Sequence, residues 1–253
     1  MRDPRVIFIT GASSGIGEAL ALSYAAKGIR LLLTGRDAGR LAQVAGRCRE
    51  QGADVVTTTI DVTDRAALAE WIVARDAEVP VDLVIANAGI SAGTGGGVET
   101  EAQARAIFAT NLDGVLNAIH PLIPAMVARG RGQIALMSSL ASFRGMAGAA
   151  AYCGSKAAVR VYGEALRGDL ARHGVGVSVI CPGFVVSRMT SVNRFPMPFL
   201  MDAERAARII RRGLAAGKGR VAFPFPTYAV SWLLGVLPPG LVDTILARAP
   251  RKG

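Results

Sequence analysis

Cysteine is scarce in this chain of 253 residues, and no long apolar leader precedes its first predicted strand. The three cysteines, Cys48, Cys153 and Cys181, are odd in number and widely spaced, so the sequence predicts neither a disulfide framework nor a zinc site. The first apolar stretch, Val6 to Thr10, is too short for the core of a signal peptide. These features predict a cytoplasmic protein that needs no metal ion.

Acidic residues are also outnumbered, with 19 Asp and Glu against 29 Lys and Arg, which gives a net charge of +10. Such an excess can indicate a nucleic acid or an anionic membrane surface as partner, but here the basic residues are scattered rather than gathered in a stripe. We interpret most of them as solvated helix faces and expect no nucleic-acid partner. Lysine itself is rare, and Lys156 is one of only four.

The chain lacks internal repeats, low-complexity tracts and a proline-rich hinge. Its length and its 51% of hydrophobic residues suffice for one large, well-buried α/β domain. We predict that residues 1–224 form this domain. Residues 225–253 are predicted to be a hydrophobic C-terminal extension of the same domain.

Short apolar runs recur at even intervals, with helical stretches between them. Runs such as Val177 to Ile180 are nearly continuous in apolar residues, which is typical of strands buried on both faces of a parallel sheet. The alternation predicts a Rossmann-like, doubly wound sheet of seven parallel strands flanked by helices. The predicted strands are Val6–Thr10, Ile29–Thr34, Val55–Ile60, Leu83–Ala86, Gln133–Ser138, Gly176–Cys181 and Arg220–Phe223.

A glycine-rich segment, Thr10 to Gly17, follows the first strand and opens the first helix. Small residues at such a turn let the backbone approach a pyrophosphate at the positive end of the helix. The spacing is Gly-x-x-x-Gly-x-Gly, which differs from the Gly-x-Gly-x-x-Gly of the long-chain dinucleotide folds. A tight strand-to-helix turn without a ligand is the alternative interpretation.

A second motif combines Ser139, Tyr152 and Lys156. Tyr and Lys at i and i+4 project from one helix face, so the ammonium can lie beside the phenol and favour its ionised form. A phenol has an ordinary pKa of about 10, and an acid or base works best when its pKa is near the operating pH. We therefore expect Lys156 to lower the pKa of Tyr152. The serine lies thirteen residues before the tyrosine, and this offset selects Ser139 over its neighbour Ser138.

Together these motifs resemble the short-chain dehydrogenase/reductase family in its compact form, over residues 5 to about 190. The resemblance implies the catalytic residues Asn111, Ser139, Tyr152 and Lys156. It also implies a set of cofactor-binding residues, which comprises Gly11, Ser13, Ser14, Gly15, Ile16, Gly17, Arg36, Arg40, Asp61, Val62, Asn87, Ala88, Gly89, Tyr152, Lys156, Pro182, Gly183, Val185 and Ser187.

The family resemblance also implies a role for each side chain. Ser139 would hydrogen-bond the substrate oxygen, and Tyr152 would give a proton to that oxygen in reduction or take one in oxidation. Lys156 would hold the nicotinamide ribose, and Asn111 would hold a water that connects Lys156 to solvent. Asp61-Val62 would contact adenine, Asn87-Ala88-Gly89 would support the sheet and the cofactor, and Pro182 to Ser187 would hold the nicotinamide, with Ser187 where Thr is more usual.

The end of the second strand bears on the choice of cofactor. An acidic residue there would bind the ribose hydroxyls of NAD and repel a 2′-phosphate, but this chain has Gly35 followed by Arg36. A guanidinium suits a phosphate, so we expect NADP(H) to be favoured over NAD(H). Arg40 could add a second cation, whereas Ser14 occupies a position that is often basic in NADP-preferring relatives and Asp37 could reach a ribose hydroxyl.

Residues 187–202 are rich in Met and Phe, and they are the predicted substrate loop. An adaptable apolar lid favours a lipophilic ketone, aldehyde or secondary alcohol, although the loop could merely pack on its own domain. Beyond it, the last strand lacks the usual Asp-Gly-Gly ending of the family, and an apolar tail follows. That tail could be a second cap over the substrate, a subunit contact or a peripheral membrane segment with Arg248, Arg251 and Lys252 nearby.

The sequence thus predicts a short-chain dehydrogenase/reductase that transfers hydride between NADP(H) and an apolar carbonyl or secondary alcohol. The alternative is a catalytically weak nucleotide sensor or scaffold on the same fold, although such a protein would not need all four catalytic residues. We expect a homodimer or homotetramer. Because the last strand departs from the family pattern, we expect the dimer at least as much as the tetramer.

Overall fold

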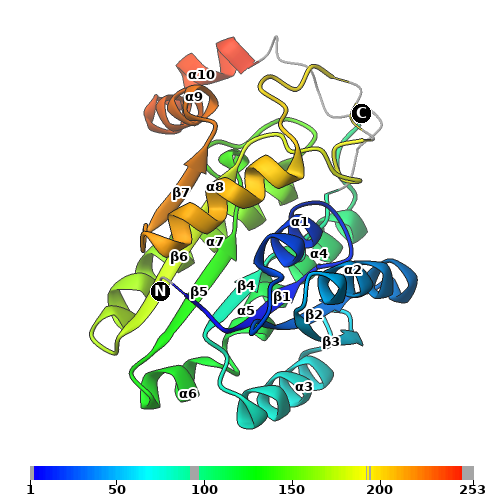
Figure 1. Cartoon of the computed structure of the whole chain (residues 1–253). Coiled ribbons are helices and arrows are strands. Elements are labelled where there is room, and N and C mark those ends of the chain that lie inside the picture. Colours follow the sequence, from blue (N-terminus) through cyan, green and yellow to red (C-terminus); the bar gives the residue numbers. More distant parts are fainter. Residues whose placement is uncertain (1–2, 92–96, 192, 194, 247–253) are drawn as a thin grey trace.

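The computed structural model describes residues 3–91, 97–191, 193 and 195–246. Its centre is a seven-stranded sheet in the order β3-β2-β1-β4-β5-β6-β7, and every neighbouring pair of strands is parallel (Figure 1). The predicted fold class is therefore confirmed. The strands are β1 (Val6–Thr10), β2 (Arg30–Gly35), β3 (Asp54–Thr59), β4 (Leu83–Ala86), β5 (Gly132–Met137), β6 (Val175–Pro182) and β7 (Arg220–Phe223).

Helices cover both faces of the sheet. Helices α1, α2 and α8 pack on one face, and α3, α5 and α7 pack on the other (Figure 1). Two short irregular helices, η1 between α4 and α5 and η2 just after β5, belong to the candidate site. The bounds are α1 (Gly15–Tyr24), α2 (Ala38–Glu50), α3 (Arg65–Glu78), α4 (Glu101–Phe108), η1 (Ala109–Asp113), α5 (Gly114–Ile119), α6 (Ile123–Ala128), η2 (Leu140–Ser142), α7 (Ala150–Ala171), α8 (Ala203–Ala215), α9 (Phe225–Val236) and α10 (Pro239–Leu246).

Strand β1 shows why the sheet is buried on both sides. Successive side chains of a strand point to opposite faces, so Ile7 and Ile9 enter the core under α1 and α8, while Val6 and Phe8 enter the core on the other face. All four are buried. Each such side chain contributes about 1.5–3 kcal/mol when fully buried, and the two cores together fix the order and register of the strands.

The strand order reverses between β1 and β4, because the chain proceeds outward from β1 to β3 and then returns to add β4 on the other side. In doubly wound sheets a ligand-binding crevice forms at this reversal, beyond the carboxyl ends of the strands. The glycine-rich turn follows β1, Asn87 follows β4, Ser139 follows β5 and Gly183 follows β6. The fold therefore brings the predicted motifs to one edge of the sheet.

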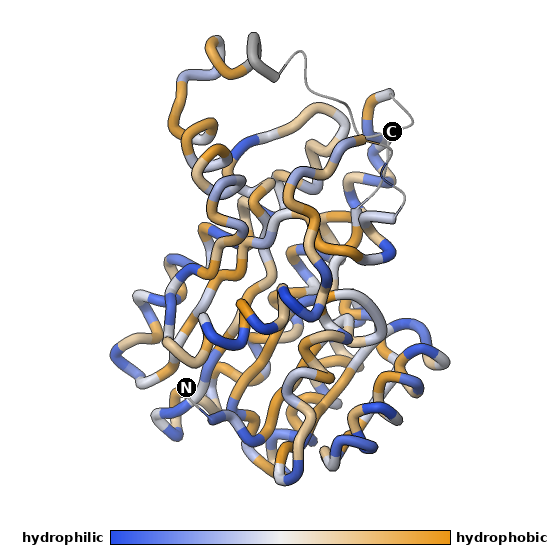
Figure 2. Tube along the Cα trace, turned by 45° about the horizontal axis from the view of Figure 1, so that its top comes forward, coloured by the Kyte–Doolittle hydropathy of each residue, from blue (hydrophilic) through white to orange (hydrophobic). Residues whose placement is uncertain are grey.

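The C-terminal helices α9 and α10 continue from β7 and extend beyond that same edge, beside the loop that precedes α8 (Figure 1). Figure 2 shows hydrophobic residues along the inner strands and again along these two outer helices. No helix in the described part of the chain is long and apolar enough to cross a membrane. The division of the chain at residue 224 stays a prediction, and Arg248, Arg251 and Lys252 lie outside the described residues.

Two glycines of α7 allow a matched test of the packing between that helix and the sheet. A Cβ on Gly163 would lie 2.6 Å from both Leu136 Cδ1 and Val179 Cγ2, whereas a Cβ on Gly168 would meet nothing within 4 Å. We expect Gly163→Ala to destabilise the fold by about 1–3 kcal/mol through overpacking. Gly168→Ala should stabilise it by about 0.5–1 kcal/mol, since Ala favours the helix over Gly.

Thermal unfolding followed by circular dichroism measures both effects, and the two midpoints should move in opposite directions from that of the parent chain. Equal midpoints for the two variants would contradict the described contact between α7, β5 and β6.

Candidate active site

A cavity of about 840 Å³ lies at the carboxyl edge of the sheet. Nearly all the predicted site residues line it, including the glycine-rich turn, Arg36, Asp61, the Asn87 turn, Ser139, Tyr152, Lys156 and the segment after β6. The two predicted residues that do not line the cavity are Gly17 and Asn111. Both lie just behind its wall, where they hold other parts of the site in place.

The glycine-rich turn requires residues without a side chain at defined positions. Gly11 and Gly15 have φ of 64° and 57°, a left-handed conformation that favours glycine. A Cβ on Gly17 would lie 2.2 Å from the carbonyl oxygen of Gly11, so only glycine lets the helix start so close to the turn. Ser14 is the N-cap of α1 and makes no side-chain capping bond. The amide end of α1 thus faces the cavity without a capping side chain.

Asn87 joins the end of β4 to this turn. Its Nδ2 donates hydrogen bonds to the carbonyl oxygens of Thr10 and Gly11, at 3.0 and 3.2 Å. In return, the Thr10 hydroxyl accepts bonds from the backbone N–H groups of Asn87 and Ala88, both at 3.0 Å. The predicted supporting role of this Asn-Ala-Gly turn therefore has a physical basis. Thr10, which the prediction treated only as the start of the loop, is an equal partner in it.

Ser139, Tyr152 and Lys156 converge on the cavity from the end of β5 and the first turns of α7. The Ser139 and Tyr152 side chains are hydrogen-bonded to each other. Lys156 Nζ is buried, lies 5.9 Å from the Tyr152 ring centroid, and donates to the Met137 carbonyl at 2.9 Å. The three side chains therefore form one cluster around a phenol hydroxyl that faces the cavity.

Burial dominates the electrostatics of this cluster. Desolvation raises the pKa of Tyr152 above its ordinary value, and the hydrogen bond with Ser139 offsets this only in part. Desolvation also lowers the pKa of Lys156 to about 8. The expectation that Lys156 holds the phenol pKa below its ordinary value is therefore wrong for the chain alone. At neutral pH the phenol is protonated, and most of the lysine remains charged.

The two adjacent serines, Ser138 and Ser139, make different contacts. The Ser138 hydroxyl is buried and donates to the Lys156 carbonyl at 2.8 Å, so it ties β5 to α7. The Ser139 hydroxyl instead bonds with Tyr152 and accepts from the Ala141 N–H at 3.1 Å. Only Ser139 touches the phenol hydroxyl, which supports the thirteen-residue offset as the selection rule.

Asn111 is fully buried in η1, a single π-helical turn between α4 and α5. Such turns are frequent at functional sites. Its Oδ1 accepts from the Ile90 N–H at 2.8 Å, and its Nδ2 donates to the Ile90 carbonyl and to Ser155 Oγ, at 3.0 and 3.1 Å. Both donors are used, and only the carbonyl oxygen keeps a free lone pair. Asn111 therefore holds the backbone after Gly89 against α7, next to Lys156.

The residues predicted to set cofactor specificity, Arg36 and Arg40, line the cavity together with Asp37 and Asp61. Arg36 Nη1 lies 3.7 Å from Asp61 Oδ2, with the Arg36 side chain 63% exposed. Partial burial by itself would raise the pKa of Asp61, but hydrogen bonds from Thr63 and the nearby Arg36 outweigh it and hold that pKa below its ordinary value. Arg40 Nη2 lies 3.0 Å from Asp37 Oδ2. Of the two arginines, Arg36 is therefore the more available to a ligand.

Gly35 also has a steric reason to be glycine. The Ala12 N–H donates to the Thr34 carbonyl at 2.9 Å, which draws the glycine-rich turn against the end of β2. A Cβ on Gly35 would then lie 3.0 Å from Ser13 Oγ and 3.1 Å from Ser13 Cβ. A larger side chain at this position would require Ser13 to shift by a few tenths of an ångström.

Part of the cavity lining is apolar. It includes Met189 and Phe195 of the predicted substrate loop, and the Phe195 ring packs 5.9 Å from that of Phe184. The loop is anchored at Ser187 and Thr190, whose hydroxyls lie 3.2 Å apart, and Thr190 Oγ1 donates to the Val185 carbonyl at 2.8 Å. Val192, which we placed in the same loop, lies outside the described residues.

Several lining residues were not identified from the sequence. Helix α9 contributes Thr227, Ser231 and Leu234, which occur one turn apart. The i, i+4, i+7 spacing could have indicated a common face, but nothing local indicated that the face meets the cavity. Other unpredicted lining residues include Thr34, Ile90, Thr110, Leu140, Arg144 and Met146.

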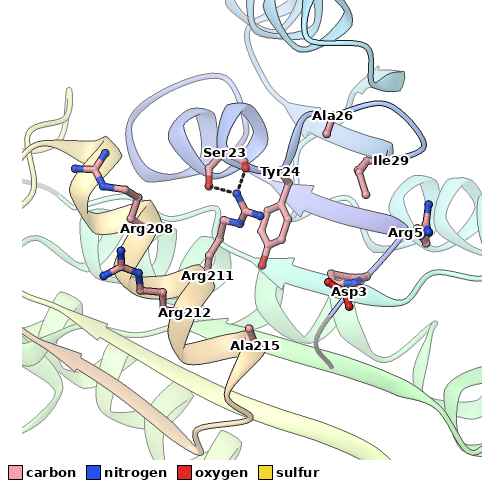
Figure 3. Close-up of a pocket in the computed structure, with 11 residues that line it drawn as sticks. Asp3, Arg5, Ser23, Tyr24, Ala26, Ile29, Arg208, Arg211, Arg212 and Ala215 are labelled. Atoms are coloured by element: carbon pink, nitrogen blue, oxygen red, sulfur yellow. Dashed lines mark hydrogen bonds between the residues drawn. The ribbon is translucent and has the colours of Figure 1, made fainter.

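A second cavity, of about 490 Å³, lies between α1, α8 and the start of β1 (Figure 3). Its notable side chain is Arg211, which stacks 4.5 Å from the Tyr24 ring centroid and donates to the carbonyl oxygen and the hydroxyl of Ser23. Burial raises the pKa of Tyr24 to about 12. Arg211 therefore ties α8 to the carbonyl end of α1. None of the predicted site residues lines this cavity.

The structure describes the ranges 3–91, 97–191, 193 and 195–246. No group of three or more His, Cys, Asp or Glu side chains there could hold a metal ion.

A doubly wound parallel sheet with a glycine-rich turn and a Ser-Tyr-Lys cluster at its carboxyl edge is the architecture of a nucleotide-dependent oxidoreductase. Residues 5–196 match the family model described as short chain dehydrogenase. The chain therefore belongs to the short-chain dehydrogenase family.

Similar proteins extend this result. An uncharacterized oxidoreductase of Myxococcus xanthus is 40% identical over 245 residues, which cover 96% of this chain and 97% of that protein. A ketoacyl reductase of Nostoc is 32% identical over 182 residues, which cover 72% of this chain and 63% of that protein. Among solved structures, a short-chain dehydrogenase from Sphingobium yanoikuyae in complex with NADPH has a TM-score of 0.80 at 24% identity, and the match covers 98% of this chain and 97% of that one.

A short chain dehydrogenase from Mycobacterium paratuberculosis bound to NAD has a TM-score of 0.76 at 24% identity, and the match covers 86% of this chain and 94% of that one. The same fold thus binds NADPH in one structure and NAD in another. At 24% identity these two likenesses show the fold of this chain, and any preference between the two cofactor forms must be sought in its own residues.

Proposed function

We propose that this protein transfers hydride between NADP(H) and the carbonyl or secondary alcohol of an apolar substrate, with Tyr152 as the general acid or base. One observation carries the proposal: the Tyr152 hydroxyl is bonded to Ser139 and faces the same cavity as the glycine-rich turn. A substrate oxygen and a nicotinamide can therefore meet at one phenol. The alternative of a sensor or scaffold does not require this cluster, so we favour the enzyme.

The residues present fit a dinucleotide cofactor. The uncapped amide end of α1, with Gly15 at its first position, suits the pyrophosphate. Asp61 and Val62 line the cavity where an adenine would lie, and the segment from Pro182 to Ser187 lines it where a nicotinamide would lie. A bound nicotinamide would supply or accept the hydride at its C4 atom.

The chain's own residues would manage the proton and the orientation of the substrate. In reduction, Ser139 would orient the substrate oxygen, and the Tyr152 hydroxyl would donate its proton to that oxygen. The Tyr152 phenol is protonated in the chain alone, as a proton donor must be, but its raised pKa makes it a weak acid, so donation needs a cation beside the phenol as the proton leaves. The charged Lys156 would stabilise the phenolate that remains. Asn111 would hold the backbone at Ile90 in place beside Lys156.

Preference for NADP(H) rests on Arg36. Its side chain is mostly exposed on the cavity wall, and its contact with Asp61, at 3.7 Å, is too long for a strong hydrogen bond. A 2′-phosphate could therefore recruit the guanidinium without breaking a buried pair. Asp61 would at the same time orient the guanidinium toward the adenosine end. Gly35 leaves the space beside the ribose without a competing carboxylate.

The substrate is proposed to be small and lipophilic, because the apolar side chains of Met146, Met189, Phe195 and Leu234 line the cavity. The remaining partner proposals are a homodimer or homotetramer, contact of the C-terminal helices with a membrane surface, and no nucleic acid. We further propose that the protein acts in the cytoplasm.

The test of the reaction itself is Tyr152→Phe, which removes the phenol hydroxyl and keeps the ring. Because general acid catalysis contributes about 10²–10⁴-fold, we expect kcat to fall at least a hundredfold while NADPH affinity changes no more than a few-fold. The control is Tyr162→Phe on the same helix, since the Tyr162 hydroxyl bonds to His120 at 2.8 Å and does not line the cavity. Steady-state kinetics and fluorescence titration measure both quantities, and retained turnover in Tyr152→Phe would refute the mechanism.

The cofactor preference is tested by Arg36→Ala. We expect NADPH to bind about tenfold or more weakly, because hydrogen bonds to a charged group contribute about 1.5–3 kcal/mol, while NADH binding changes little. Arg47→Ala on α2 is the control, since Arg47 pairs with Glu18 at 2.7 Å and does not line the cavity. An equal loss for both cofactors in Arg36→Ala would mean that the 2′-phosphate is recognised elsewhere.

A further inference from the structure

Helix α9 presents three different faces to its surroundings. Its residues advance by about 100° each around the helix axis, so Thr227, Ser231 and Leu234 share one face, and this face lines the active-site cavity. A second face packs on the domain, where the Tyr228 ring lies 5.5 Å from that of Phe143. Gly235 belongs to this side too, since a Cβ there would lie 2.6 Å from the Phe143 carbonyl oxygen.

The third face is apolar and exposed to solvent. It carries Phe225, Trp232, Leu233 and Val236, which are 74%, 49%, 49% and 59% exposed. None of the residues of α9 is charged, and none of them is buried. Figure 2 shows this helix standing at the margin of the molecule while still carrying hydrophobic residues. A surface helix of a soluble protein normally carries charged or polar residues on the face opposite its buried one. The exposed apolar face of α9 therefore requires a partner.

The same edge of the molecule has further exposed apolar residues. Leu241 of α10 is 60% exposed, Phe199 of the substrate loop is 59% exposed, and Met146, which lines the cavity, is 45% exposed. Figure 1 shows α9, α10 and the substrate loop at this one edge, beyond the carboxyl ends of the strands. The apolar surface therefore borders the candidate active-site cavity, which Met146 and α9 line, rather than a remote part of the fold.

Charge indicates which partner fits this surface. Residues 225–253 hold one acidic residue, Asp243, against Arg248, Arg251 and Lys252, and the whole chain has a net charge of +10. These three basic residues lie outside the described part and follow shortly after α10 in the sequence. Apolar helices followed by cations are typical of segments that lie on anionic lipid, where Trp prefers the interface. A second copy of this chain would bring like charges together.

We infer that the exposed face of α9 binds an anionic lipid bilayer and that α9 is thereby a shared wall between lipid and the active-site cavity. The inference rests on the proposed function for its substrate class: a lipophilic carbonyl or alcohol dissolved in the bilayer would enter past α9 and the substrate loop without crossing water. Helix α9 lies on the membrane surface and does not span it.

The experiment uses the full chain and vesicles of phosphatidylcholine, with or without phosphatidylglycerol. The chain has two tryptophans, Trp71 and Trp232, so Trp71→Phe leaves Trp232 as the single reporter. Adding vesicles that contain phosphatidylglycerol should shift its fluorescence to the blue, and neutral vesicles should bind at least tenfold more weakly. No shift with either kind of vesicle would overturn the inference.

A matched pair of double variants locates the surface. Trp232→Gln with Leu233→Gln should lower co-sedimentation with the anionic vesicles at least tenfold. The control, Val73→Gln with Val161→Gln, changes side chains that are 52% and 55% exposed on α3 and α7, and it should bind as the parent does. Equal loss in both variants, or in neither, would contradict the assignment to α9. Binding to no vesicle, with a dimer that dissociates in the α9 variant by sedimentation equilibrium, would show instead that a second copy covers this face.

The two proposals fail separately, because vesicle binding requires no turnover. If NADPH supports reduction of water-soluble ketones, both variants should keep the parent kcat/KM in the absence of lipid. With a ketone dissolved in the anionic vesicles, the α9 variant should lose activity about as much as it loses binding. An α9 variant that reduces the vesicle-borne ketone as fast as the parent would refute the access route, even if the enzyme proposal holds.

Discussion

The junction between the glycine-rich turn and the end of β4 is the constraint on which the rest of the site depends. Asn87 and Thr10 exchange hydrogen bonds across it, and Gly17 lets α1 start against the turn. Because β1 and β4 flank the point where the strand order reverses, this junction sets the floor of the cavity. The Ser139-Tyr152-Lys156 cluster approaches the same cavity from the end of β5, which pairs with β4, and from α7.

In the Ser139-Tyr152-Lys156 cluster, burial opposes the charged forms of both Lys156 and Tyr152. Lys156 is buried with the Met137 carbonyl as hydrogen-bond acceptor, and its pKa of about 8 reflects the cost of that burial. Tyr152 is desolvated as well, so its phenol stays protonated. A carbonyl substrate would meet a proton donor already in place, and the nearby ammonium would stabilise the phenolate only once the proton has left. Lys156 would therefore stabilise the phenolate that forms during the reaction, whereas it does not ionise Tyr152 beforehand.

Much of this could be predicted from the sequence. The seven strands appear within a residue or two of the predicted bounds, since continuous apolar runs in an alternating pattern leave few other folds. Local motifs also placed Ser139, Tyr152 and Lys156 on one cavity. The sequence could not show that the pKa of Tyr152 is raised, because desolvation depends on which residues pack around α7. The sequence also could not show that Thr227 and Leu234 line the cavity, because this depends on how α9 packs after β7. The π-helical turn at Asn111 had no local signal.

The central claim is that hydride and proton meet at a substrate carbonyl held by Tyr152 and Ser139. The most direct measurement mixes the protein with NADPH that carries deuterium at C4, in each stereochemical form, and a panel of lipophilic ketones and aldehydes, and then analyses the alcohols by mass spectrometry. The account predicts that one of the two forms transfers deuterium to the carbinol carbon. NADPH oxidation without deuterium in the product, or tight NADPH binding with no alcohol formed across the panel, would contradict it.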